Sequence, residues 1–171
     1  MPFLLKLPPH WGVRATRLPG VVLAKGENNL IIVSACLADV ACRYNGAGKP
    51  NEKVIGLVSE GKAIPICPEQ LGGLPTPRAL AEIIGKRVIR QDGVDVTEAF
   101  NRGAQEALKI ARLVGAKRAI LKARSPSCGC GKIYDGSFSG RLVDGNGVFT
   151  ELCKKDGIEV KTEEEIQALV T

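Results

Sequence analysis

The stretch Leu30-Ile31-Ile32-Val33-Ser34-Ala35-Cys36 decides the fold, because a short apolar and β-branched run ends just before a cysteine. Short runs of this kind, bounded by loop residues, predict buried strands. The pattern occurs three times: Cys36 follows residues 30–33, Cys67 follows residues 63–66, and Cys128 follows residues 119–121 after a short turn. If these strands are parallel, their carboxyl ends meet at one edge of a sheet, where α/β proteins hold their ligands. We therefore expect three thiols that are far apart in sequence to meet in space.

The length and composition suit a single α/β domain. The chain has 171 residues, of which 44% are hydrophobic, enough for one core. From residue 30 onward, short β-rich runs alternate with helical periodicity, which predicts a mainly parallel sheet with helices on both faces. Residues 1–29 are interrupted by Pro8 and Pro9. We assign residues 1–29 to an N-terminal extension and residues 30–171 to the domain.

Local signals predict the other elements. Glycines and prolines predict a long loop without regular structure over residues 68–78. Asp92-Gly93 predicts a hairpin over residues 87–96, and Asp95 with Glu98 predicts a capping box for the longest helix, which ends at Gly115. We also expect helices at 51–60, at 149–155 and from Thr162, strands at 117–122 and 158–160, and a glycine-rich loop at 124–147.

Six cysteines without a secretory signal predict a reducing compartment, in which thiols bind metals or do chemistry rather than form disulfides. No apolar run approaches the length of a transmembrane helix, so we expect a cytoplasmic protein without a membrane partner. The formal charge of +6 is compatible with an anionic partner, but the charges are scattered and only 4% of the residues are aromatic. A thiolated RNA is therefore a less favoured partner than a small molecule.

The three cysteines at the strand ends favour a metal site. A zinc finger presents its ligands as CxxC pairs, and the chain has none. A site assembled from three separate loops better suits an iron–sulfur cluster on Cys36, Cys67 and Cys128, which leaves one iron without a protein ligand. Cys42 and Cys130 lie close enough in sequence to substitute for these ligands, whereas Cys153 is interpreted as a core residue of a late helix.

The neighbours of these cysteines supply acid–base groups. Glu69 follows Cys67 by two residues, so it is a candidate general acid or base. Its alternative is a loop carboxylate paired with Arg78. Ser125 and Ser127 precede Cys128 and offer hydroxyl donors, with local turn hydrogen bonds as the alternative.

Other reaction classes are disfavoured by missing motifs. The chain contains neither a GxGxxG after a strand nor a P-loop, so nucleotide hydrolysis is not expected. Its single histidine, His10, precedes the domain, which argues against histidine-based triads and histidine-ligated metals.

Taken together, four motifs resemble those of a bacterial domain-of-unknown-function family whose characterised members are thiouracil desulfidases. They are Ser34-Ala35-Cys36-Leu37, Cys42-Arg43-Tyr44-Asn45-Gly46, Cys67-Pro68-Glu69 with Gly72-Gly73-Leu74-Pro75, and Arg124-Ser125-Pro126-Ser127-Cys128-Gly129. The resemblance covers about residues 30 to 160. Asn45 stands where the family pattern has Asp, which bears on substrate contacts rather than on the cluster.

The resemblance implies a Rossmann-like domain with a 4Fe-4S cluster on Cys36, Cys67 and Cys128. It also implies replacement of a pyrimidine sulfur by oxygen, with sulfide release and no net redox change. Glu69 is then the candidate for the carboxylate that activates water, and Ser125 for the assisting hydroxyl, with Ser127 as its competitor. The substrate is a thiouracil base or a thiouridine nucleotide. The alternative is a non-enzymatic carrier that stores or delivers iron, sulfur or persulfide with the same thiols.

Overall fold

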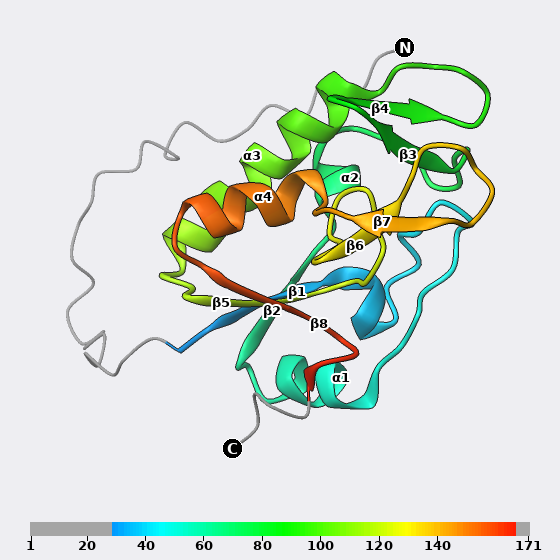
Figure 1. Cartoon of the computed structure of the whole chain (residues 1–171). Helices are drawn as coiled ribbons and strands as arrows, with labels where there is room; N and C mark the ends of the chain where they lie inside the picture. The colour runs from blue at the N-terminus through cyan, green and yellow to red at the C-terminus, as the bar shows by residue number, and fades with distance from the viewer. Residues whose placement is uncertain (1–28, 167–171) are drawn as a thin grey trace, which may run out of the picture.

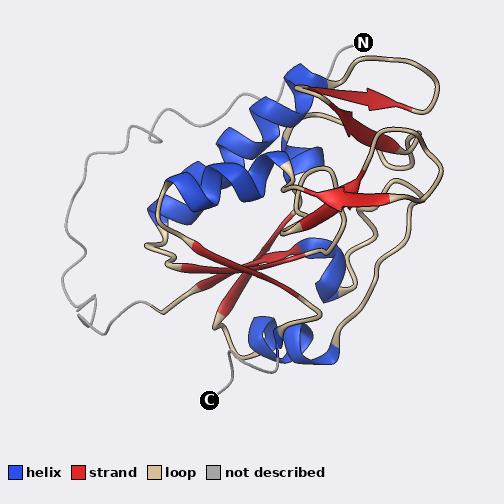
Figure 2. Ribbon diagram, viewed as in Figure 1, coloured by secondary structure: helices blue, strands red, loops and turns tan. Residues whose placement is uncertain are grey.

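The computed structural model describes residues 29–166, and its centre is a parallel sheet of four strands (Figures 1 and 2). The strands are β1 (Ile31–Ser34), β2 (Ala63–Ile66), β5 (Arg118–Leu121) and β8 (Glu159–Thr162), in the order β2-β1-β5-β8. Ile31 is in register with both Ala63 and Arg118, and Arg118 is in register with Glu159. The strands therefore end level, and the loops that follow them emerge at one edge.

Helices cover both faces of this sheet, as the sequence predicted (Figure 1). On one face, α3 (Thr97–Leu113) and α4 (Val148–Lys155) pack over Ile32, Ala119 and Leu121. On the other face, the 3₁₀ helix η1 (Ala35–Ala38) and α1 (Glu52–Ser59) cover Ile31, Val33 and Ile120. Alternate residues of β1 and β5 thus enter different cores, which explains why these strands are apolar throughout.

Two antiparallel hairpins lie beyond the carboxyl edge of the sheet (Figure 2). One joins β3 (Ala81–Ile84) to β4 (Arg87–Arg90), and the other joins β6 (Lys132–Tyr134) to β7 (Leu142–Asp144). The second hairpin lies within the predicted loop 124–147, so that prediction was incomplete. It is short, and its strand β7 is exposed throughout, so it carries no alternating apolar pattern to reveal it.

The predicted hairpin over residues 87–96 forms in part. Around the Asp92-Gly93 turn, Arg90 N–H donates to the Val94 carbonyl and Val96 N–H to the Val88 carbonyl, both at 2.9 Å, and Ile89 and Asp95 form an antiparallel bridge. The longer ladder, which the prediction missed, joins β4 to β3 across the turn at Gly85. Residues 81–84 supply more apolar side chains to the hairpin core than residues 94–96 do, so they make the longer ladder.

The segment 68–78 also departs from its prediction, because α2 (Pro68–Leu71) forms at its start. Proline is well tolerated at the first helical position, where its missing N–H needs no partner. The α2 backbone packs directly on α3: a Cβ on Gly103 would lie 1.8 Å from the carbonyl oxygen of Pro68, and one on Gly72 would lie 2.1 Å from that of Ala99. This close contact fixes the position of the residues around Cys67.

Of the predicted helix starts, the one near residue 51 is confirmed, whereas the capping box predicted at Asp95 is wrong. The predicted helix at 51–60 is α1, whose first N–H groups are capped by the Asn51 side chain. The predicted capping box at Asp95 does not form, because Asp95 Oδ1 accepts from Thr97 N at 2.9 Å and the helix begins after Val96. Glu165 accepts from the Thr162 N–H at 2.9 Å, but most of the helix predicted after Thr162 lies outside the described residues, as does the extension 1–29 apart from its last residue.

No helix within residues 29–166 is long and apolar enough to cross a membrane.

Candidate active site

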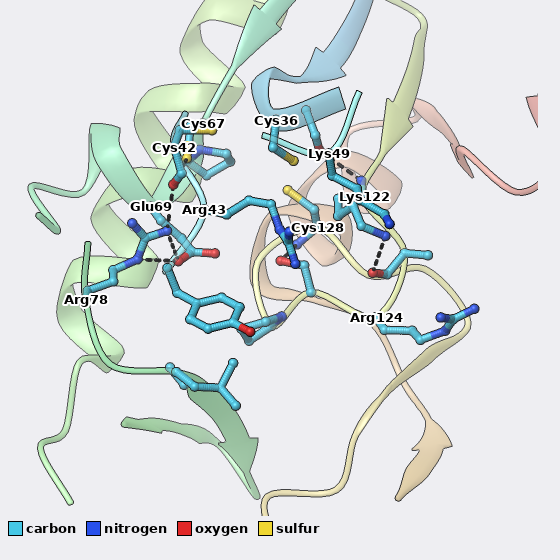
Figure 3. A pocket seen from close by; sticks show the side chains of 18 of the residues that line it. Cys36, Cys42, Arg43, Lys49, Cys67, Glu69, Arg78, Lys122, Arg124 and Cys128 are labelled. Carbon is cyan, nitrogen blue, oxygen red and sulfur yellow. Dashed lines mark hydrogen bonds and ion pairs between the residues drawn. The ribbon is translucent and has the colours of Figure 1, made fainter. Parts of the chain in front are cut away.

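A cavity of about 510 Å³ opens at the carboxyl edge of the sheet, where the loops after β1, β2 and β5 meet the two hairpins. Four cysteines from three segments of the chain line it: Cys36, Cys42, Cys67 and Cys128 (Figure 3). The level strand ends explain why residues so distant in sequence share one cavity. The convergence of Cys36, Cys67 and Cys128 predicted from the strand ends is therefore present.

Three of these thiols, those of Cys36, Cys42 and Cys67, interact in a row. The hydrogen bond with Cys36 is the main cause that raises the pKa of Cys42 to about 11. The Cys42 side chain in turn raises the pKa of Cys67 far above its ordinary range, and burial adds to this effect. Cys67 Sγ lies 3.9 Å from the carbonyl oxygen of Cys42. The raised pKa values mean that the Cys42 and Cys67 thiols favour their neutral form, although the nearby Arg78 acts in the opposite direction on Cys42.

Cys128 approaches the cavity from the loop after β5. Its thiol points toward that of Cys36 in Figure 3, and burial raises its pKa well above the ordinary range. The nearby Ser34 and Ser127 hydroxyls act in the opposite direction on the pKa. The loop is fixed from behind, because Thr150 Oγ1 of α4 donates to the Cys128 carbonyl at 2.8 Å.

The two remaining described cysteines lie outside the cavity lining. Cys130 is directed elsewhere, with its Sγ 3.7 Å from the carbonyl oxygen of Val160 in β8. Cys153 is fully buried in the core under α4, which agrees with its interpretation as a packing residue, and burial raises its pKa to about 12. Of the two substitute ligands suggested by sequence, only Cys42 shares the cavity.

Glu69 lines the cavity and is paired with Arg78, as its alternative interpretation predicted (Figure 3). Glu69 Oε2 accepts from Arg78 Nε at 2.8 Å and from Nη2 at 2.6 Å, and the two side chains are only 16% and 5% exposed. Arg78 Nη2 also donates to the Cys42 carbonyl at 3.0 Å. The Arg78 guanidinium therefore contacts both the Glu69 carboxylate and the backbone of the loop that carries Cys42.

The two serines differ in position. Ser125 lines the cavity, and its hydroxyl accepts from the N–H groups of Ser127 and Cys128 at 3.1 and 3.2 Å. The turn hydrogen bonds given as its alternative are therefore formed. Ser127 is 1% exposed and is not part of the lining. Its Oγ has no hydrogen-bond partner among the described residues, although it is near the Cys128 thiol.

Positive charge surrounds the rim of the cavity. Lys122 and Arg124 are paired with Glu163 and Glu164, which follow β8. Arg43 and Lys49 also line the cavity and have no acidic partner among residues 29–166. Arg43 lies over the Tyr44 ring at 5.7 Å from its centroid. Two cations therefore remain available to an anionic ligand at the rim.

Ser34 and Glu82 are among the cavity residues to which the sequence analysis assigned no role. Ser34 is buried, and its Oγ accepts from the Lys122 N–H at 2.9 Å, which links the ends of β1 and β5. Glu82 is 3% exposed on β3. An acidic residue inside the apolar run Ala81-Glu82-Ile83-Ile84 was the available signal for it, because a carboxylate is rarely buried without dedicated partners.

The four cysteine side chains in the cavity suit a metal centre with thiolate ligands. Thiolates select iron–sulfur clusters, zinc and copper, and the described residues contain no histidine. No three cysteine, aspartate or glutamate side chains within residues 29–166 are placed to hold a single metal ion. A polynuclear cluster spaces its ligands more widely than one ion does, and its positive irons would stabilise the buried thiolates. The site thus fits a cluster better than a mononuclear metal.

Comparisons with known proteins agree with this geometry. Residues 31–165 match the family model of 2-thiouracil desulfurase. The uncharacterized protein YbbK of Bacillus subtilis (strain 168) is 43% identical over 151 residues, which cover 82% of this chain and 100% of YbbK. A solved structure, the [4Fe-4S]-dependent thiouracil desulfidase TudS, superposes with a TM-score of 0.79 at 44% identity, covering 82% of this chain and 95% of TudS. The chain belongs to the 2-thiouracil desulfurase family.

Proposed function

We propose that the protein replaces the sulfur of a thiolated pyrimidine by oxygen and releases sulfide, with a 4Fe-4S cluster bound by Cys36, Cys67 and Cys128. The observation that carries this proposal is the convergence of these thiols on one cavity that also contains the Glu69 carboxylate. Membership of the 2-thiouracil desulfurase family and the likeness to TudS support the same activity.

The ligand assignment follows the strand ends. Cys36, Cys67 and Cys128 each come soon after one of three adjacent parallel strands, which gives them rigid support. Cys42 belongs to the loop between η1 and α1 and contacts two of these residues, so we assign it as a neighbour of the cluster rather than a ligand. Cys130 is not a ligand in this proposal, because its thiol is directed to Val160.

A cluster held by three thiolates supplies an iron without a protein ligand, which is a Lewis acid for the substrate sulfur. The exchange balances without a redox step: a C=S group and water give a C=O group and hydrogen sulfide. Glu69 contributes the base. Its Oε2 is held by Arg78, while Oε1 has no hydrogen bond within the described residues, so Oε1 accepts the proton of the attacking water. Ser125, at the cavity wall, is the assisting hydroxyl, and Ser127 is its competitor.

Within this proposal, the favoured substrate is a thiouridine nucleotide rather than the free base. Arg43 and Lys49 line the rim without an acidic partner among the described residues, and a 5′-phosphate is the group of a nucleotide that such cations bind. Lys122 and Arg124 are already neutralised by Glu163 and Glu164, so they offer less to a phosphate.

Substitution of Glu69 separates an enzyme from a carrier of iron or sulfur. Glu69→Gln keeps the size of the side chain but removes the base, so we expect sulfide release to fall about a hundredfold or more with the iron content unchanged. Glu60→Gln, at an exposed carboxylate paired with Lys62, is the matched control and should behave as the unmodified protein. Sulfide release that is unaffected by Glu69→Gln contradicts the role of Glu69, and a loaded protein that releases no sulfide at all favours the carrier.

Substitution of Lys49 tests the nucleotide preference. Lys49→Gln removes one rim cation, so we expect the KM for 4-thiouridine monophosphate to rise about tenfold while the KM for 4-thiouracil stays within twofold. The measurement is steady-state sulfide release with both compounds. Lys53→Gln, on an α1 residue outside the cavity, is the control. An equal change for both compounds would contradict a phosphate contact at Lys49.

A further inference from the structure

Phe138, in the loop between β6 and β7, lines the cavity with a backbone conformation that aromatic residues rarely adopt. Its φ is 58°, in the left-handed region. Within residues 29–166 only Asp39, Arg124 and Phe138 have this conformation without being glycine, and Arg124 also lines the cavity. Such conformations cost free energy, and they persist at ligand sites where the surrounding structure enforces them.

Glu82 is the residue that enforces this conformation. Its Oε2 accepts from the N–H groups of Gly136 and Phe138, both at 3.0 Å, and the residue is 3% exposed. Gly136 itself lies against β3, because a Cβ there would be 2.6 Å from Ile84 Cγ1 and 2.9 Å from the Ile83 carbonyl oxygen. A buried carboxylate with two N–H donors thus holds residues 136–138 over the cavity.

The aromatic side chains are distributed unevenly. The described part of the chain has five, of which Phe100 and Phe149 are fully buried in the cores. The other three are at least partly accessible, and all of them line this one cavity: Tyr44, Tyr134 and Phe138. An accessible aromatic ring in a cavity offers a flat face on which a heteroaromatic base stacks.

We propose that Phe138 is the aromatic wall on which the pyrimidine ring of the substrate stacks, and that Glu82 is the positioning residue that holds Phe138 there. This inference rests on the proposed function, because it assumes a pyrimidine substrate. It explains three features together. Glu82 is a buried carboxylate with no cationic partner within residues 29–166, Phe138 has a strained backbone, and the accessible aromatic rings of this part of the chain line one cavity.

The test uses the cluster-loaded protein under anaerobic conditions, with sulfide release from 4-thiouracil and 4-thiouridine monophosphate as the activity. Phe138→Ala and Phe138→Gly should raise the KM about fivefold or more with a smaller change in kcat, because base stacking is lost. Phe138→Tyr should stay within twofold. Phe138→Gly should leave the thermal unfolding midpoint unchanged or raised, since glycine adopts a φ of 58° without strain.

Two further variants complete the test. Leu142→Ala, in the same hairpin but outside the cavity lining, is the matched control and should leave the KM unchanged. Glu82→Gln retains an acceptor oxygen and should change the KM less than Glu82→Leu, which removes both acceptors. The inference is overturned if the KM is unaffected in Phe138→Ala, or if Phe138→Gly lowers the unfolding midpoint, which would make Phe138 a packing residue. The failure of the proposed function gives a different result, because the unmodified protein then releases no sulfide from any thiopyrimidine. If the unmodified protein is active and the Phe138 variants have an unchanged KM, only the inference about Phe138 fails.

Discussion

The side chains at the cavity show how strongly one residue depends on its neighbours. Arg78 contacts Glu69 and the Cys42 carbonyl at once, so the position of the carboxylate and that of the cysteine loop are coupled. Arg78 contacts only Oε2 of Glu69, so the other carboxylate oxygen, Oε1, takes no part in this ion pair. A buried ion pair of this kind costs desolvation and contributes geometry more than stability.

Substitution of single cysteines tests the ligand assignment directly. We expect Cys36→Ala, Cys67→Ala and Cys128→Ala each to abolish cluster formation, since a cluster with two protein thiolates is poorly held. Cys42→Ala and Cys153→Ala should retain the iron content of the unmodified protein. The measurement is iron and acid-labile sulfide per chain after anaerobic reconstitution.

Cys153→Ala is the control for substitution of a buried cysteine, because that residue is fully buried in the core away from the cavity. A full cluster in any of the first three variants would refute the assignment of that residue. Loss of iron in Cys42→Ala, with the protein still folded, would move Cys42 into the ligand set.

How much of the site was predictable also differs from residue to residue. Cys36, Cys67 and Cys128 were predictable as a group, because each follows an apolar run that ends at the same sheet edge. Glu82 was not, because its significance depends on a loop more than 50 residues later folding back onto it. The roles of Cys42 and Cys130 were open in sequence, and only side-chain direction separates them.

At the element scale, the contact between α2 and α3 positions both Cys67 and Glu69. Gly103 and Gly72 allow the two backbones to touch, so the short helix has almost no freedom to shift. This helix was not predicted, because proline and glycine at its ends are typical of a loop. Its stability comes from packing on α3 rather than from its own propensity.

Substitution of Gly103 tests this coupling. Gly103→Ala places a Cβ 1.8 Å from the Pro68 carbonyl oxygen, so we expect the free energy of unfolding to fall by about 2 kcal/mol or more, and cluster loading to fall with it. Gly56→Ala is the matched control in α1, where a Cβ meets nothing within 4 Å, and it should stabilise the protein by up to about 1 kcal/mol. Urea unfolding and iron content measure the two effects. Equal behaviour of the two variants would contradict the role of the α2 contact.

In the molecule as a whole, the faces of the sheet form the cores, and its carboxyl edge forms the candidate active site. Helices cover both faces, and the two hairpins lie beyond the carboxyl edge (Figure 1). The cavity lies at this edge, and residues of both hairpins line it. The parallel sheet was predictable from alternating β and helical patterns. The hairpins were not predicted correctly, because their short strands are partly exposed and their pairing depends on contacts with each other beyond the sheet.

Sulfide release by the anaerobically reconstituted protein decides whether the protein is a desulfidase. We expect protein loaded with about four irons per chain to convert a thiolated pyrimidine to its oxygen form with one sulfide released per pyrimidine, and cluster-free protein to do neither. A protein that carries the full cluster and releases no sulfide from 4-thiouracil, 2-thiouracil or 4-thiouridine monophosphate would contradict it.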